Sequence, residues 1–214
     1  MLGDKIVVKP HHTRAAQQAF EKINSRVLET NQRVAITVAG ESGSGKSEIA
    51  SELARLFREN GARSVIYHQD DYFEYPPKTN DKKRREKGLE RVGMKEVRMD
   101  LLDEHIKKSK NKDIEEIKKP LIDYDNDKIL SEVFDLSDIK IVLAEGTYTT
   151  ALESADIRIF IDRSYKETLE HRKERARDEL DEYAEKILEK EHEIISSQKE
   201  KADVIITKDY EVSD

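Results

Sequence analysis

The segment from Gly40 to Ser47 has the residue types and spacing of a phosphate-binding loop, and it reads Gly-Glu-Ser-Gly-Ser-Gly-Lys-Ser. Its glycines allow successive backbone amides to turn toward an anion, and the positive end of a following helix adds to that attraction. Lys46 would bring a positive charge to the β- and γ-phosphates, and the Ser47 hydroxyl is placed to bind Mg²⁺. The residues expected to contact the nucleotide are Gly40, Ser42, Gly43, Ser44, Gly45, Lys46, Ser47 and Glu48.

The runs that flank this loop have the patterns of a strand and a helix. Val34–Ala39 is almost continuously apolar, and Glu48–Leu56 repeats apolar residues at helical spacing. A phosphate-binding loop requires a strand, a glycine-rich turn and a helix in this order. An ordinary turn rich in Gly and Ser is the alternative, and this context argues against it.

Acidic and aromatic residues follow two other apolar runs that read as buried strands. Ser64–His68 is followed by Gln-Asp-Asp-Tyr-Phe, which contains Asp70 and Asp71, and Ile139–Ala144 is followed by Glu145. Because ligands bind at the carboxyl ends of parallel strands, these residues are well placed for catalysis on the edge that carries the loop. Glu145 lies where a phosphate-loop enzyme has its second carboxylate on the Mg²⁺ side. The alternative for Asp70 and Asp71 is that they cap a turn or a helix start.

A cluster of arginines lies between His171 and Asp178. Arg172 and Arg175 are three residues apart, so they share a face if this segment is helical, and Arg177 follows. Guanidinium groups match the negative charge that phosphoryl transfer spreads over the equatorial oxygens. A solvent-exposed helix with paired Glu and Arg side chains is the alternative.

The remaining periodicity predicts the elements that position these residues. Five strands interleaved with helices predict a three-layer α/β fold with a mainly parallel central sheet and helices on both faces. The predicted strands are 34–39, 64–68, 139–144, 157–162 and 204–206, with a shorter one at 120–125; the predicted helices are 12–30, 48–56, 94–110 and 164–201, the last being one helix or two with a break near Asp178.

Two polar stretches have no predicted chemical role. Residues 4–9 could form a short strand or an extended arm, and 80–91 is a basic run expected to be a solvated helix or a mobile loop rather than an anion site. His11 and His12 could form a metal or phosphate pair, but adjacent helical residues do not face the same way, so a solvent-exposed terminus is the expectation. We expect a single domain over 1–214, with an arm and helix in 1–32, a core in 33–163 and 202–208 that carries an insertion at about 74–127, and a helical lid in 164–201.

Composition limits the classes of partner. With 36% apolar and 40% charged residues the chain can bury a core inside a highly charged shell, and its formal charge of −7 argues against a general nucleic-acid or membrane-surface binder. There is no cysteine, so thiol chemistry and disulfides are excluded. Because the sequence has no apolar run long enough to span a membrane and no signal-peptide pattern, a cytoplasmic location is the expectation.

Taken together, these motifs resemble the uridine kinase and phosphoribulokinase family, which also includes pantothenate kinase. The order and rough spacing agree over about residues 33–207. The segments that carry the resemblance are Gly40–Ser47, Gln69–Phe73, Glu145–Tyr148, the arginine cluster at Arg172, Arg175, Arg177 and Asp178, and Ala202–Ile206.

The resemblance implies a phosphate-loop kinase that uses ATP and Mg²⁺. It implies that Asp70 accepts the proton of the acceptor hydroxyl, that Ser47, Asp70 and Glu145 hold Mg²⁺, and that Arg172, Arg175 and Arg177 lie in a lid over the triphosphate. Lys46, Asp70 and these arginines are thus the catalytic candidates. The substrate-binding candidates are Asp70, Tyr72, Phe73, Asp100, Tyr124, Glu145 and Tyr148, with Asp100 expected at the ribose hydroxyls and Tyr124 near the base.

The chain departs from uridine kinases on the acceptor side. Val97–Leu101 stands where they have an Asn-Phe-Asp-His-Pro stretch, and Asn126–Lys128 lacks the His that follows their Tyr-Asp pair. The lid arginines are also spaced one residue differently. Acids at Asp123, Asp125 and Asp127 favour a neutral or cationic acceptor over a sugar phosphate, unless they face water.

Three functions are compatible with these residues. The leading one is an ATP-dependent kinase that phosphorylates a hydroxyl of a small molecule such as a nucleoside, a sugar or a related alcohol. The second is a nucleotide-dependent ATPase or switch; Thr207–Tyr210 begins like a guanine-reading element but has Tyr where Asp belongs, which disfavours GTP. The third is an interaction protein in which the apolar stripe from Leu169 to Ile195 forms a homodimer interface.

Overall fold

The central sheet has five parallel strands in the order β2-β5-β1-β6-β7. The computed structural model describes residues 2–3, 6–175 and 181–213, without the side chains of His171, Glu174 and Arg175. The strands are β1 Val34–Gly40, β2 Arg63–His68, β5 Ile139–Gly146, β6 Ile157–Ile161 and β7 Val204–Ile206. Every β1 residue is buried, as a strand covered on both faces of a parallel sheet must be. The predicted parallel α/β fold is confirmed.

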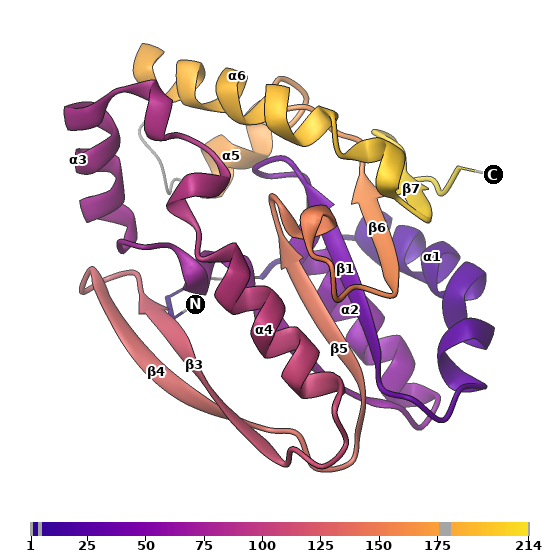
Figure 1. Cartoon of the computed structure of the whole chain (residues 1–214). Coiled ribbons are helices and arrows are strands. Elements are labelled where there is room, and N and C mark those ends of the chain that lie inside the picture. The colour runs from indigo at the N-terminus through magenta and orange to yellow at the C-terminus, as the bar shows by residue number, and fades with distance from the viewer. Residues whose placement is uncertain (1, 4–5, 176–180, 214) are drawn as a thin grey trace.

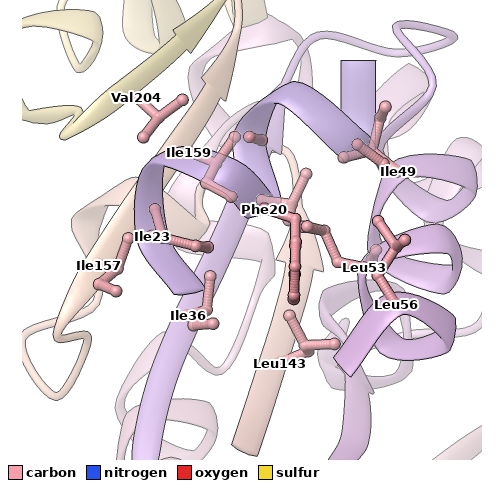
Figure 2. Packing of buried hydrophobic residues seen from close by; sticks show 14 of the residues in the cluster. Phe20, Ile23, Ile36, Ile49, Leu53, Leu56, Leu143, Ile157, Ile159 and Val204 are labelled. Carbon is pink, nitrogen blue, oxygen red and sulfur yellow. The ribbon is translucent and has the colours of Figure 1, made fainter. Parts of the chain in front are cut away.

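Helices α1 (Pro10–Leu28) and α2 (Lys46–Glu59) cover one face of the sheet (Figure 1). The small residues of α1 bring it close to α2, and Phe20 reaches between them to stack edge-on against Phe57 with ring centroids 5.0 Å apart. Figure 2 shows Phe20 and Ile23 of α1 facing Leu53 and the strand residues beneath. This apolar layer holds α2, and therefore the loop that precedes it, on the sheet.

The opposite face is covered by α4 (Met99–Lys110) and by the end of α6 (Glu182–Ser196). Leu102 and Ile106 of α4 and Ile195 of α6 are buried there against Tyr148 and strand residues. The apolar stripe predicted as a dimer interface therefore packs in part within the molecule, although Leu169 at the start of α5 (Leu169–Arg175) is exposed. In the described part of 164–201, α5 ends at Arg175 and α6 begins at Glu182, and Arg177 and Asp178 lie outside the described residues.

A helix and a hairpin lie between β2 and β5 in the chain. They are α3 (Pro77–Lys87) and the antiparallel pair β3 (Glu116–Asp123) and β4 (Lys128–Asp135). The short strand expected at 120–125 thus begins earlier, and its partner β4 was not predicted. Figure 1 shows the hairpin beside α4, and the hairpin also contacts the edge strand β2, where Phe134 lies 4.9 Å from Tyr67 between ring centroids.

Short 3-10 helices complete the described chain, and the N-terminal arm touches the hairpin. Leu2 forms a parallel bridge to Asp123, whereas residues 6–9 are not a strand. The 3-10 helices are η1 Gln69–Tyr72, η2 Leu89–Arg91, η3 Met94–Glu96, η4 Thr149–Ala151 and η5 Lys199–Lys201, so the helix predicted over 94–110 is divided between η3 and α4. Each described helix is too short or too polar to span a bilayer.

Candidate active site

The glycine-rich loop leaves β1 at Gly40 and enters α2 at Lys46. Ser44 N donates to Glu41 O at 3.1 Å, which closes the turn, and Gly45 caps the helix with φ 92°. The Lys46 ammonium donates to Glu41 O at 2.9 Å, so the lysine lies over its own loop. The Ser44 hydroxyl is buried with no hydrogen-bond partner among the described residues, which fits a loop whose donors are kept for a phosphate.

The start of the lid packs directly on this loop. Gly43 has φ 76°, and a Cβ there would lie 2.8 Å from Cγ of Arg172, so glycine is required for the contact. The Thr168 hydroxyl donates to Ser42 O at 2.8 Å, and Arg172 Nη2 donates to Tyr165 O at 3.0 Å. The structure therefore brings Arg172 to the loop. Arg175 ends α5, but its side chain lies outside the described part of the chain, as does Arg177.

Glu41 joins the loop to the turn before α5 and to α6, and it was not among the candidate site residues. Its carboxylate accepts from Tyr165 N at 2.5 Å through Oε2 and contacts His192 Nδ1 at 2.6 Å through Oε1. Glu41 is buried although it occupies a position where the loop pattern allows any residue. The pattern itself gives no signal for this role, because the partners lie far away in the sequence.

The back of the loop is held by both ends of the chain. The Tyr210 hydroxyl donates to Ser44 O at 3.1 Å and accepts from Arg163 Nη1 at 2.5 Å. A Cβ on Gly45 would lie 3.0 Å from Nε2 of His12. The expectation that His12 is solvated was wrong: it is buried because α1 packs against the loop.

Glu145 lies beside the start of α2 and is the best-supported metal-side carboxylate. Burial opposes its ionisation, but hydrogen bonds from His68 and the Ser47 hydroxyl and the Lys46 charge lower its pKa below the usual value. The His68 contact is 2.7 Å from Nδ1 to Oε1; burial opposes protonation of His68, and Glu145 outweighs it, so the pKa of His68 is raised. A buried carboxylate beside a hydroxyl is a donor set that suits Mg²⁺.

The turn that carries Asp70, η1, packs on the end of β5, the strand that ends in Glu145 and Gly146. Gly146 meets Gln69 so closely that an added Cβ would lie 2.2 Å from the Gln69 Cβ, and Gln69 Oε1 accepts from Tyr148 N at 2.7 Å. Burial raises the pKa of Tyr148, and nearby charges that include Asp70 contribute. The structure thus brings the turn that carries Asp70 to the strand end that carries Glu145, at the predicted edge of the sheet.

Asp71 has a different environment from its neighbour. It is fully buried and accepts from Lys119 Nζ at 2.7 Å and from Ile122 N at 2.9 Å, both on β3. Lys119 is also fully buried and pairs with Glu132 of β4 at 2.6 Å. Asp71 therefore fixes the hairpin to the turn that carries Asp70, a role that neither alternative from the sequence included.

The other acceptor-side candidates are spread over several elements. Tyr72 is fully buried and its hydroxyl is 2.8 Å from His105 Nδ1, so the structure does not offer that hydroxyl to a substrate. Phe73 is half-buried and bridges to Val97. Asp100 is exposed in the first turn of α4, and Tyr124 follows β3.

The acids of the hairpin turn are used locally. Asp127 accepts from the Lys78 and Thr79 amides and so caps α3, and Asp123 accepts from Asn126. They give no support to a neutral or cationic acceptor. Glu48, a nucleotide-binding candidate, is buried in the first turn of α2.

The basic run on α3 is largely solvent-exposed, as expected, but two of its arginines also contact the predicted lid. Arg84 pairs with Glu96 at 2.6 Å and with Glu191 of α6 at 3.0 Å. Arg85 pairs with Asp181 at 2.9 Å, at the start of α6. The segment thus joins the acceptor-side insertion to the lid helix.

The amino-acid sequence of the chain matches a known protein family over most of its length. Residues 35–212 match the phosphoribulokinase / uridine kinase family. The chain belongs to this family. A uridine kinase of Ureaplasma parvum is 30% identical over 139 residues. The match covers 63% of this chain and 65% of that protein, so this chain spans less than two thirds of the length of that relative.

One further relative and one solved structure are also similar to the chain. A bifunctional alpha-galactosidase/sucrose kinase of Mediterraneibacter gnavus is 31% identical over 195 residues, which is 83% of this chain and 20% of that protein. The structure of a possible uridine kinase from Bacillus stearothermophilus superposes with a TM-score of 0.65 at 18% identity, covering 90% of this chain and 97% of that one. The last likeness supports the phosphate-loop kinase fold.

Proposed function

We propose that this protein is an ATP-dependent kinase that transfers the γ-phosphoryl group to a hydroxyl of a small molecule. The observation that carries the proposal is the packing of the Asp70 turn on the end of β5, whose residue Glu145 accepts a hydrogen bond from Ser47 of the phosphate loop. A kinase needs both a cradle for the triphosphate and a base for the acceptor on one edge of the sheet. The names of the uridine and sucrose kinase relatives agree with this reaction class.

The candidate site residues have separate roles in this reaction. The loop amides, Lys46 and the Ser44 hydroxyl bind the phosphates, and Ser47, Glu145 and Asp70 would hold Mg²⁺, which neutralises charge on the β- and γ-oxygens. Asp70 accepts the proton as the acceptor oxygen bonds to the γ-phosphorus and the bond to the bridging oxygen of the leaving ADP breaks. Arg172, which packs on the loop, would neutralise charge on the transferring group, and Arg175 and Arg177 are proposed to share this role; the Arg175 side chain and Arg177 lie outside the described residues.

We also propose that the protein acts in the cytoplasm on a small-molecule acceptor, without nucleic acid. The absence of cysteine and the charge of −7 support this proposal.

A coupled ADP-release assay tests the function. The protein is offered ATP or GTP with a panel of nucleosides, sugars, sugar phosphates and hydroxy acids. We expect ADP release that depends on one acceptor class and on Mg²⁺, lost in Lys46→Met and kept in the exposed control Lys190→Met. Nucleotide hydrolysis at a rate that no acceptor raises would instead identify an ATPase.

A further inference from the structure

One helix, α6, contacts both the phosphate loop and the insertion on the acceptor side. Figure 1 shows this helix running along the carboxyl ends of the sheet strands, from α3 at one end to β7 at the other. Glu191 and His192 are neighbours in α6, and adjacent helical residues point about 100° apart. Each therefore reaches a different part of the molecule: His192 contacts the loop, and Glu191 contacts α3.

The contact between α6 and the phosphate loop is made through Glu41. Its buried carboxylate lies 2.6 Å from His192 Nδ1, and the imidazole packs edge-on against Tyr165 with ring centroids 5.9 Å apart. A cavity of about 330 Å³ adjoins this contact, and Glu41, Arg163 and His192 are among its lining residues. A ligand in this cavity would touch both side chains of the contact, so α6 is placed to respond when a ligand binds beside the loop.

The contact between α6 and the insertion is a shielded group of charges. Arg84 of α3 pairs with Glu191 at 3.0 Å and with Glu96 at 2.6 Å, and these side chains are 16%, 13% and 0% exposed in that order. Beside them Ile194 packs so closely on Gly93 that an added Cβ would lie 2.6 Å from its Cδ1. Close packing is not continuously deformable, so we expect a shift of α6 to be followed by the segments that it contacts.

A series of contacts leads from α3 to the turn that carries Asp70. In the first turn of α3, the Thr79 amide and hydroxyl donate to Asp127 of the hairpin turn at 3.1 and 2.6 Å. The hairpin is in turn fixed to Asp71 through Lys119. The position of α3 therefore bears on the residue that we propose as the base, although the two lie in different elements.

Helix α3 depends on polar contacts for its position, because its own sequence offers almost no apolar anchor. All 11 of its residues are described, and Asn80 is the only buried one among them. Helices with few buried contacts open readily, and hydrogen exchange of their amides reports the opening. Contacts such as the Arg84–Glu191 pair should therefore decide how often α3 opens.

We propose that α6 couples nucleotide binding to the placement of the acceptor side, with His192 and Glu191 as the positioning residues. This inference rests on the proposed kinase function, because it requires a nucleotide in the phosphate loop. Binding there rigidifies α6 through Glu41 and His192, and Glu191 passes the change to α3 through Arg84. By thermodynamic linkage, the acceptor then strengthens nucleotide binding by the same factor as the nucleotide strengthens acceptor binding. Such coupling completes the acceptor side only when ATP is in place, as in induced fit.

Hydrogen exchange of the α3 amides tests the coupling without a known acceptor. The full-length protein is measured alone and with a saturating non-hydrolysable ATP analogue and Mg²⁺. In the wild type we expect slower exchange at the start of α2, where the analogue binds, and exchange slowed at least about fivefold in α3, the lower end of usual coupling. Glu189→Met, at an exposed position of the same helix, is the control and should behave like the wild type.

Two variants break the coupling at opposite ends. His192→Phe keeps a ring against Tyr165 and removes the contact with Glu41. It leaves the Arg84 pairs unchanged, so α3 should exchange as in the wild type when no nucleotide is bound. Glu191→Met leaves Arg84 paired with Glu96, so the variant should still fold.

Both variants should separate the response of α3 from that of α2. The analogue should still protect the start of α2 in each variant, and its protection of α3 should be lost. Glu191→Gln keeps an oxygen that accepts a hydrogen bond from Arg84, so it should recover part of the α3 protection.

The outcomes distinguish this inference from the proposed function. If the analogue protects α2 but not α3 in the wild type, or if α3 stays protected in either variant, the coupling is wrong and the kinase stands. Faster α3 exchange in unliganded His192→Phe would indicate a merely structural role and would also overturn it. If α3 protection depends on both residues but no acceptor is phosphorylated in the ADP-release assay, the kinase proposal fails and the coupling remains. An analogue that protects neither segment would overturn both.

Discussion

The donor side and the acceptor side of this site are built in different ways. The phosphate loop is one continuous segment, and its shape is set by glycines and by hydrogen bonds within Gly40–Ser47. The acceptor side is assembled from η1, α4 and the hairpin, and the buried Asp71–Lys119 pair fixes two of these elements to each other. A local motif can be shared by many enzymes, whereas an assembled pocket can change its specificity by changing one of its parts.

Replacing Asp70 with Asn should have the largest effect, because the acceptor side would lose its base while the donor side remains intact. General-base catalysis contributes about 10²–10⁴ in rate, so we expect kcat to fall by that factor. Binding of a fluorescent ATP analogue should change little. Because Asn has nearly the same size as Asp, the variant should fold like the wild type, and a loss of turnover can then be assigned to the missing carboxylate. Near-normal turnover of the preferred acceptor by Asp70→Asn would remove Asp70 from this role.

Lys119→Met should cause the largest loss of stability, because it leaves Asp71 buried without its counter-charge. Breaking a buried pair by removing one partner costs about 3–5 kcal/mol, and urea unfolding measures the loss. Lys118, its exposed neighbour on β3, provides the control, and Lys118→Met should cost less than about 0.5 kcal/mol. If the two variants were equally stable, the hairpin would not depend on this pair.

The central fold was predictable because its signals are local. Each of the five sheet strands was expected within two residues of its observed limits, since a buried parallel strand reads as a short apolar run. β4 was missed because Lys128–Asp135 lacks the alternation of a half-buried strand, with adjacent apolar residues at Ile129–Leu130 and Val133–Phe134, and stays largely exposed. The first half of β3 was missed for a similar reason: Lys119 is a strand residue whose burial depends on Asp71 and Glu132.

The site was predictable only where one segment supplies the residues. The loop and the acids at strand ends follow from order along the chain. Glu41, His68 and His12 were missed, since each acts through a partner that is far away in the sequence or on another element.

His68 offers a test of the donor side, where we expect a smaller effect. His68→Leu removes the donor that orients Glu145, and residues of this kind typically contribute 10–100-fold to metal affinity, so we expect about tenfold more Mg²⁺ for half-maximal activity. His68→Gln restores an N–H donor and should recover part of the loss. A Mg²⁺ dependence unchanged in His68→Leu would show that Ser47 alone orients Glu145.

The smallest expected effect concerns the exposed contact between the hairpin and the sheet. The pKa of Asp135 is lowered to about 2, first by the Ser137 backbone amide and then by Arg63 of β2. A lowered folded pKa gives stability that is present above the unfolded value of 3.8 and is lost as the pH falls toward 2. NMR titration of the Asp135 carboxyl should therefore show only a partial rise of its pKa in Arg63→Gln, since the Ser137 amide remains. A complete return of the Asp135 pKa to the unfolded value would mean that the ion pair with Arg63 is the main cause of the shift.

The Tm of Arg63→Gln should stay close to that of the wild type, because a solvent-screened pair contributes far less than the buried one at Lys119.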